Sequence, residues 1–226
     1  MLIRNFTISL AAACLAWVLP GVASTEKSGD YNSAYQLVES TTARVMDVVM
    51  AADAYVDEDP ERYYAQVQEL LDPLIDYRGF SRSVMGPYAS SKRYRALDES
   101  GREALRAQLD RFTDVMRSSL IRTYSKGLLA FGGSRIEVLA SEDDETDARR
   151  VSVRQHVYAD RDEPYVVLYQ MGRSKSGDWK LRNVIIESVN LGEIYRDQFQ
   201  ASAREEQGDI DQVIAKWTVV TVDVES

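Results

Sequence analysis

A long stretch of helical spacing constrains the fold of this chain more than any other feature. Apolar residues recur every three or four positions from Leu105 to Phe131, which is typical of a helix with one apolar face. At a rise of 1.5 Å per residue, a helix of about 27 residues is roughly 40 Å long. Gly132 and Gly133 follow it and predict its end. Residues 100–103 fit a capping box with Ser100 at the N-cap position.

The residues before the long helix also show helical patterns. Residues 35–56 carry one apolar stripe. Asp59 and Pro60 then resemble an N-cap followed by proline at the first helical position. This second helix is predicted to kink or stop near Pro73, since proline is unfavourable inside a helix. Residues 78–94 contain two glycines and a proline, so short helical turns are expected there.

After the long helix the pattern changes to that of strands. Four short runs are rich in Val, Ile and Tyr: residues 135–139, 150–158, 165–171 and 179–186. Residues 176–178 (Ser-Gly-Asp) predict a hairpin turn, and the acidic residues 141–147 predict a solvated loop. Helical spacing returns after Asn190, an expected N-cap, and again over residues 209–217, whereas residues 218–226 alternate and predict an edge strand. The predicted fold is α+β, with helices on one side of a curved antiparallel sheet of about four strands.

The N-terminus has the pattern of a secretory signal peptide. Arg4 precedes an uncharged, mostly apolar run of about 14 residues, and small residues stand at 22–24 as a cleavage site. The run is shorter than the about 20 residues that a spanning helix needs. A lipoprotein signal around Cys14 is the less favoured alternative, because the apolar run continues beyond it. The expected organisation is a signal peptide over residues 1–24 and one exported domain over residues 25–226.

Composition excludes several classes of function. Lys and Arg total 27 against 36 Asp and Glu, a formal net charge of -9. A chain this acidic is repelled by nucleic-acid phosphates and by anionic lipid surfaces. One His and one Cys leave almost no ligands for zinc or iron–sulfur sites. We therefore expect no metal, no cofactor, no nucleic-acid partner and no enzymatic activity.

Three candidate catalytic features are each better explained in another way. His156 is the single imidazole and lies in a strand-like run, so a structural or surface role is favoured. Ser81 stands in a sequence that begins like a nucleophile elbow but lacks the closing glycine and the preceding strand. The acidic residues 143–145 are typical of a solvated turn. The 13 tyrosines fit ordinary core packing, or a cavity with apolar walls and polar rims that holds an amphiphile.

Four blocks in a fixed order resemble one protein family. They are residues 80–86 (FSRSVMG), 120–131 (LIRTYSKGLLAF), 165–191 (YVVLYQMGRSKSGDWKLRNVIIESVNL) and 195–199 (YRDQF). Together they resemble MlaC and the toluene-tolerance proteins, the periplasmic phospholipid-binding components of a lipid-transport system, over most of residues 35–217. The chain departs from that family at Asn183, Ser188 and Asn190, where Asp, Gly and Ser are usual. It is also longer around residues 92–100.

The resemblance implies a carrier that shuttles phospholipid through the periplasm as a monomer. Its partners would be an outer-membrane lipoprotein complex and an inner-membrane ABC transporter, and an apolar cavity would hold the acyl chains. The residues expected to line that cavity come from the helix–sheet boundary: Phe80, Val84, Met85, Leu120, Tyr124, Leu128, Val167, Tyr169, Met171, Val184, Ile186, Tyr195 and Phe199. Arg196 is expected to bind the head group or to form a structural salt bridge.

Other functions remain open at this point. A binding protein for a different apolar molecule and an adaptor that only contacts other proteins both fit the same pattern. A small hydrolase that uses Ser81 is a third possibility.

Overall fold

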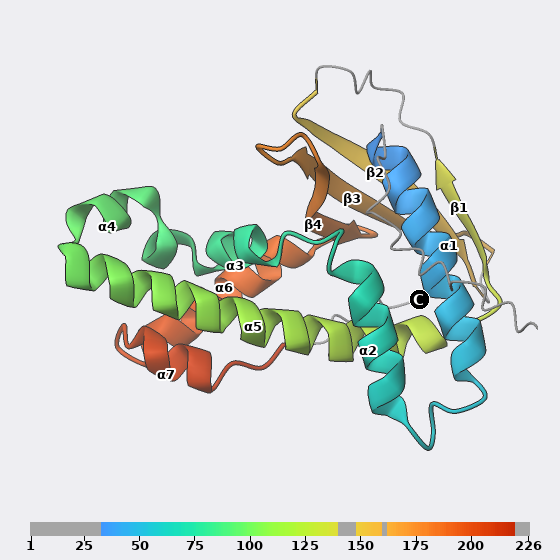
Figure 1. The fold of residues 1–226 in the computed structure, drawn as a ribbon, viewed down its shortest axis with the longest axis horizontal. Coiled ribbons are helices and arrows are strands. Elements are labelled where there is room, and N and C mark those ends of the chain that lie inside the picture. The colour runs from blue at the N-terminus through green and yellow to red at the C-terminus, as the bar shows by residue number, and fades with distance from the viewer. Residues whose placement is uncertain (1–32, 140–147, 160–161, 220–226) are drawn as a thin grey trace, which may run out of the picture. The chain divides into compact units, whose positions relative to one another are not determined.

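The computed structural model describes residues 33–139, 148–159 and 162–219, all within the compact unit Tyr31–Ser226. Helices and strands follow the order that the sequence pattern predicts (Figure 1). The helices are α1 (Ala34–Ala52), α2 (Pro60–Leu71), α3 (Tyr77–Met85), the 3₁₀ helix η1 (Gly86–Ala89), α4 (Ser91–Ala96), α5 (Glu99–Leu129), α6 (Leu191–Glu205) and α7 (Ile210–Ala215). The strands are β1 (Arg135–Leu139), β2 (Arg150–Tyr158), β3 (Tyr165–Arg173), β4 (Trp179–Ile186) and β5 (Val189–Asn190).

The two N-terminal helices begin as their sequences predict. The Ser33 hydroxyl accepts a hydrogen bond from the Gln36 amide at 3.1 Å and caps α1. Asp59 caps α2 by accepting from the Arg62 amide at 3.1 Å, with Pro60 in the first helical position. α2 ends at Leu71, two residues before Pro73. This end is as expected, because proline has no backbone N–H to continue the helical hydrogen bonds.

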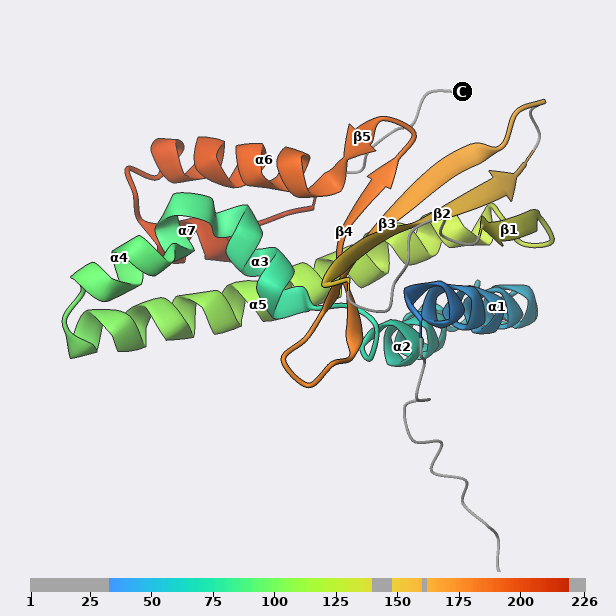
Figure 2. The same cartoon turned by 90° about the horizontal axis from the view of Figure 1, so that it is seen from above.

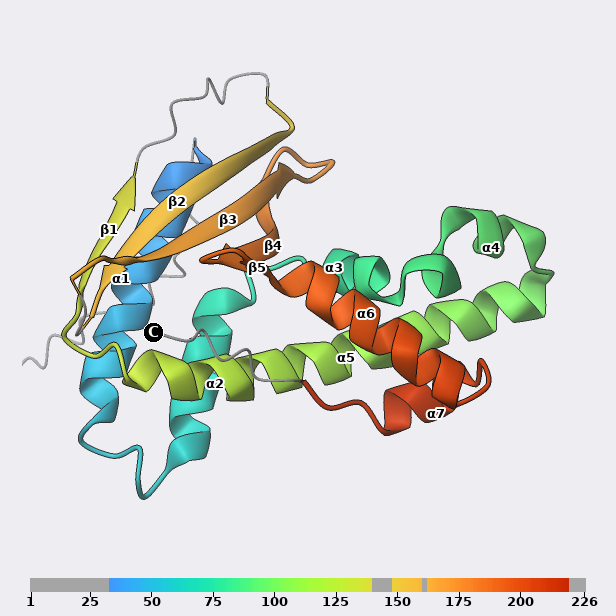
Figure 3. The ribbon, with the colours of Figure 1, turned by 180° about the vertical axis from the view of Figure 1, so that it is seen from behind.

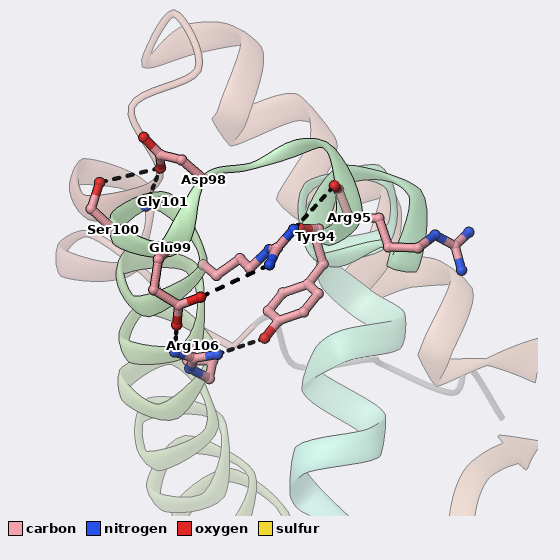
Figure 4. Close-up of polar contacts among 8 residues, drawn as sticks. Tyr94, Arg95, Asp98, Glu99, Ser100, Gly101 and Arg106 are labelled. Atoms are coloured by element: carbon pink, nitrogen blue, oxygen red, sulfur yellow. Dashed lines mark hydrogen bonds and ion pairs between the residues drawn. The ribbon is translucent and has the colours of Figure 1, made fainter.

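The long helix α5 runs over 31 residues, and its predicted cap is wrong. The N-cap is Asp98, whose carboxylate accepts from the Gly101 amide at 2.8 Å (Figure 4). Ser100 lies inside the helix and donates to the same carboxylate at 3.2 Å. The amide and hydroxyl bonds lower the pKa of Asp98. A carboxylate is favoured over a hydroxyl here because its negative charge also interacts with the positive end of the helix dipole.

The glycine- and proline-containing segment before α5 forms short helices, as predicted. α3 ends at Gly86, whose φ of 53° lies in the left-handed region where a side chain is strained. η1 and α4 follow and complete the connection to α5. α3 lies between α5 and α6 (Figure 2).

The sheet is an antiparallel meander in the order β1-β2-β3-β4-β5. The first four strands are those predicted, and β5 is a short fifth strand beyond the expected four. The hairpin between β3 and β4 turns at Gly177, which has a φ of 98°. At the other end of β4, the Asn183 amide donates to Asn190 at 2.8 Å and its oxygen accepts from the Gly192 amide at 3.0 Å. These bonds fix the corner from which α6 starts.

Asn190 caps α6 as predicted, accepting from the Glu193 amide at 3.3 Å. The predicted signal peptide and the acidic loop at 141–147 lie outside the described residues. So does most of the predicted strand at 218–226, and its two described residues are in no strand.

Three groups of buried side chains form the core. The first joins α3, α5, α6 and α7 around Phe112 and Phe199. The second packs the start of α1 against β2, β3 and β4. The third lies where the end of α1 meets α2 and the last turns of α5. In Figure 3 the strands and α1 lie at one end of α5, and α4, α6 and α7 lie along its other end.

The third core contains a buried hydrogen bond between two helices. The Tyr63 side chain is fully buried, and its hydroxyl donates to the Ser125 carbonyl of α5 at 2.9 Å. We expect Tyr63→Phe to lower the free energy of unfolding by about 1 kcal/mol, because a buried hydrogen bond between α2 and α5 is lost. Urea denaturation measures the change. Tyr64→Phe is the control, since the half-buried Tyr64 makes no hydroxyl hydrogen bond to another described residue; equal losses in both variants would contradict the prediction.

Candidate functional site

Strand register brings the five predicted strand residues to one face of the sheet. In β3, Val167, Tyr169 and Met171 alternate and therefore point to the same side. In the adjacent strand β4, Ile186 is opposite Val167 and Val184 is opposite Tyr169. Residues directly opposite in paired strands share a face. The five side chains thus form one continuous apolar surface.

Helix α1 packs on this face through the second core, and the first core, to which α5 contributes, borders it. Leu120 and Tyr124 of α5 pack against the first core, as do Val184 and Ile186 of β4. Tyr169 and Val184 also border the second core, which contains the start of α1. Val184 therefore touches two cores and marks the point where they meet.

The 13 predicted residues divide into two sets by burial. Six are core side chains in this structure: Phe80, Val84, Met85, Met171, Tyr195 and Phe199. The other seven are half-buried. They are Leu120, Tyr124, Leu128, Val167, Tyr169, Val184 and Ile186, and we call them the seam. Leu128 borders the third core, and Val167 belongs to none of the three. The other five seam residues border the first or the second core.

Polar groups at the seam satisfy one another without a charge. The hydroxyls of Tyr124 and Tyr195 lie 2.7 Å apart and share a hydrogen bond. Tyr169 donates to the Gln155 side chain at 2.6 Å, and the Gln155 amide donates to the Thr42 hydroxyl at 2.8 Å. Burial raises the pKa of Tyr124, Tyr169 and Tyr195, so all three are neutral at physiological pH. The seam is apolar with neutral hydrogen-bonding groups at its edges.

The raised tyrosine pKa values make stability sensitive to alkaline pH. Burial raises the pKa of Tyr63 to about 12 and raises those of Tyr77, Tyr169 and Tyr195 further. The unfolded chain ionises near pH 10 while the folded chain stays protonated. The stability is therefore complete below pH 10 and falls above it, by about 1.4 kcal/mol per pH unit for each such tyrosine. Urea titrations at several pH values, with tyrosinate absorbance as the second readout, test this; a flat profile from pH 10 to 12 would contradict it.

Arg196 is held by neutral acceptors. Its guanidinium donates to the Ser83 carbonyl at 3.1 Å and to the Ser83 hydroxyl at 2.9 Å, which joins α6 to α3. Among the described residues Arg196 does not form the expected salt bridge. Its acceptors are the carbonyl and the hydroxyl of Ser83. Arg196 therefore has a structural role at this contact, and no carboxylate of the described residues pairs with its positive charge.

Two of the three catalytic candidates, Ser81 and His156, lie in the described residues and are not hydrogen-bonded to each other, and residues 143–145 lie outside them. Ser81 is fully buried in α3, and its hydroxyl has no hydrogen-bond partner among the described residues. His156 lies on β2 with its ring edge-to-face to Tyr158 at 6.3 Å. Within the described ranges there is no group of His, Cys, Asp and Glu that could hold a metal ion. None of the described helices combines the length and hydropathy needed to span a bilayer.

Two adjoining hollows, which the sequence analysis did not predict, lie beside α3. One has a volume of about 620 Å³ and lies between α3, α4 and α5; the other, about 510 Å³, lies between α3, η1 and α6. Both include Gly79, Arg82 and Ala89 in their walls. Arginines from four helices surround them, which we consider further below. The sequence feature that could have indicated them is the local excess of Lys and Arg over residues 77–117.

Comparisons with known proteins agree with the observed fold and with the family resemblance of the sequence. The family model described as MlaC protein matches residues 39–219. The toluene tolerance protein ttg2D of Pseudomonas putida is 28% identical over 183 residues, which cover 81% of this chain and 79% of that protein. A solved phospholipid-binding protein from Ralstonia solanacearum, in complex with a phospholipid, has a TM-score of 0.65 at 20% identity, covering 81% of this chain and 98% of that chain. The match over residues 39–219 shows that this chain belongs to the MlaC family.

Proposed function

We propose that this protein is a periplasmic phospholipid carrier, exported by its N-terminal signal peptide, which holds acyl chains at the seam. It would pass lipid between an outer-membrane lipoprotein complex and an inner-membrane ABC transporter. Membership of the MlaC family supports a role in lipid binding and transport. The structural similarity to a protein solved with a bound phospholipid supports the fold needed for it.

The observation that carries the proposal is the row of half-buried apolar side chains on one face of β3 and β4. Among the described residues, Met50 is the one large apolar side chain that is exposed. The seam is one place where apolar surface is only partly covered, and it joins elements from distant parts of the sequence. An acyl chain that parts α5 from β4 would contact residues of two cores at once.

Elementary energetics favour an apolar site over a polar one. A diacyl phospholipid has on the order of 30 methylenes, each contributing about 0.8 kcal/mol when it leaves water, or roughly 25 kcal/mol in total. A few hydrogen bonds of about 1 kcal/mol each cannot compete with that contribution. The neutral tyrosines at the seam are consistent with such a site, because a buried charge would oppose entry of the chains.

A carrier must also release its cargo. If the seam stabilises the chains about as well as a bilayer does, lipid can move in either direction, and the direction of transport then depends on the partner's energy source. The seam residues meet this requirement better than a closed core, since their half-buried state leaves a route for exchange.

Lipid extraction from the purified protein tests the proposal. Protein prepared without detergent should have a native mass larger than its polypeptide mass by one or more phospholipids, and solvent extraction should recover them. A refolded sample offered phosphatidylglycerol vesicles is the second arm, because it excludes loss during purification. A polypeptide mass alone in both arms would refute the carrier function and leave an adaptor. Recovery of a different apolar molecule would instead identify another class of ligand.

A further inference from the structure

The segment around α3, α4 and the first half of α5 has a charge opposite to that of the whole chain. Residues 77–117 contain nine Lys and Arg against five Asp and Glu, although the chain has 27 against 36. α4 lies beside the first turns of α5, at the end away from the strands (Figure 1). An acidic protein thus has one positively charged region, and a strong local field of this kind attracts a negative partner.

This region is concave. The two hollows beside α3 share Arg82, and their walls combine cations with a small apolar floor. The arginines are Arg78, Arg82, Arg95, Arg106 and Arg196, and the apolar residues are Ala89, Leu105 and Leu109. We call these two hollows together the basic groove.

Only part of the positive charge in this region is neutralised. Arg78 forms an ion pair with Asp110, and Arg106 forms one with Glu99 at 3.2 Å. In contrast, Arg82 donates to the Ala89 carbonyl at 3.2 Å and to the Ser91 hydroxyl at 2.6 Å, which are neutral.

Arg196 is likewise held by neutral groups. Lys92, Arg93 and Arg95 of α4 are exposed and form no ion pair within the part of the chain that the structure describes. Figure 4 shows the Arg95 side chain directed away from Glu99 and Arg106.

The backbone of α4 is fixed, so these cations are held in place. Arg102 of α5 donates to the Tyr94 carbonyl at 3.2 Å and to the Arg95 carbonyl at 3.4 Å. Arg106 donates to the Tyr94 hydroxyl at 2.5 Å. α4 is thus attached to α5 through the carbonyls of Tyr94 and Arg95, near its C-terminal end.

From these observations we infer that the basic groove is a docking surface for an acidic segment of a partner protein, with an apolar side chain of that segment on the Leu105–Leu109 floor. A bilayer surface fits less well. α4 exposes no large apolar side chain for insertion, and the net charge of -9 repels anionic lipid. The inference rests on the proposed function, which supplies the partners: one of the two membrane complexes.

Charge reversal on α4 tests the inference. The variant Lys92→Glu/Arg93→Glu/Arg95→Glu alters exposed side chains only. Its matched control is Arg150→Glu/Arg154→Glu/Lys175→Glu, three exposed cations on β2 and the β3–β4 hairpin with the same change in net charge. The immobilised carrier is offered each membrane complex of the same bacterium, solubilised in detergent, at low and at high salt. Phosphatidylglycerol vesicles are offered separately.

We expect the α4 variant to bind one complex about tenfold or more weakly at low salt, with a smaller difference at high salt, and the control to bind as the unaltered protein does. Equal weakening in both variants would show general electrostatics and overturn the inference. Binding of vesicles that depends on the α4 cations, or no binding of either complex, would also overturn it. The lipid content of the same preparations separates the two proposals. If the protein contains lipid but the α4 variant binds the complexes as well as the unaltered protein does, the docking surface is refuted and the carrier function is not.

Discussion

Replacing Val184 by glutamate should remove bound phospholipid while the protein stays folded. Val184 touches two cores and shares its face of β4 with Ile186. A carboxylate placed there without a partner costs several kcal/mol when an acyl chain covers it. Since about 1.4 kcal/mol corresponds to a factor of ten, occupancy should fall more than tenfold. Phospholipid per mole of protein, measured after solvent extraction, is the readout.

The adjacent residue provides the control for this variant. Ile185 is opposite Leu168 and therefore points to the other face of the sheet, although it is half-buried like Val184. Ile185→Glu should keep its lipid. Leu120→Trp is a second test without a charge, because its added ring occupies the space that an acyl chain would take. Undiminished lipid in both Val184→Glu and Leu120→Trp would exclude the seam as the site.

Removing the Phe112 ring should have the largest effect on stability. Phe112 is fully buried, with its ring 4.9 Å from that of Phe199 and 5.1 Å from that of Trp217, both in edge-to-face geometry. Phe112→Ala leaves a cavity among α5, α6 and Trp217, which follows α7 by two residues, so we expect the free energy of unfolding to fall by about 3–5 kcal/mol. Urea denaturation followed by circular dichroism measures it.

Phe131→Ala is the matched control for Phe112→Ala. Phe131 is half-buried, and its ring lies 6.0 Å from that of Tyr165. Its loss should cost about 1–2 kcal/mol. A similar loss from both substitutions would mean that the first core is not the main source of stability.

Periodicity was sufficient to predict most of the fold. The four main strands and the long helix appear where alternation and helical spacing placed them, because the apolar residues that set those periods are the ones that become buried. The N-cap of α5 was predicted two residues too late, at Ser100 instead of Asp98. Both residue types are good caps, and only the backbone conformation decides between them. β5 was missed because two residues are too short for any alternation.

The candidate site was predictable in part. Alternation along β3 and β4 placed Val167, Tyr169, Val184 and Ile186 on a common face only once the register between the strands was known. Sequence could not separate Phe199, a core residue, from Leu120 at the seam, because helical spacing gives both the same apolar face. The local excess of Lys and Arg in residues 77–117 indicated the positive charge of the basic groove, but Arg196 of α6 joins it across a long sequence separation that no local pattern reports.

The hydrogen bond between Tyr124 and Tyr195 has a consequence for the unloaded protein. Each hydroxyl already has a partner in the other, and Tyr169 is paired with Gln155, so water entering this region would gain few new bonds. A space lined in this way stays dry when it is vacated. If the seam holds the cargo as proposed, closure of the surrounding side chains rather than hydration should follow its departure, and the unloaded molecule should be the more compact one.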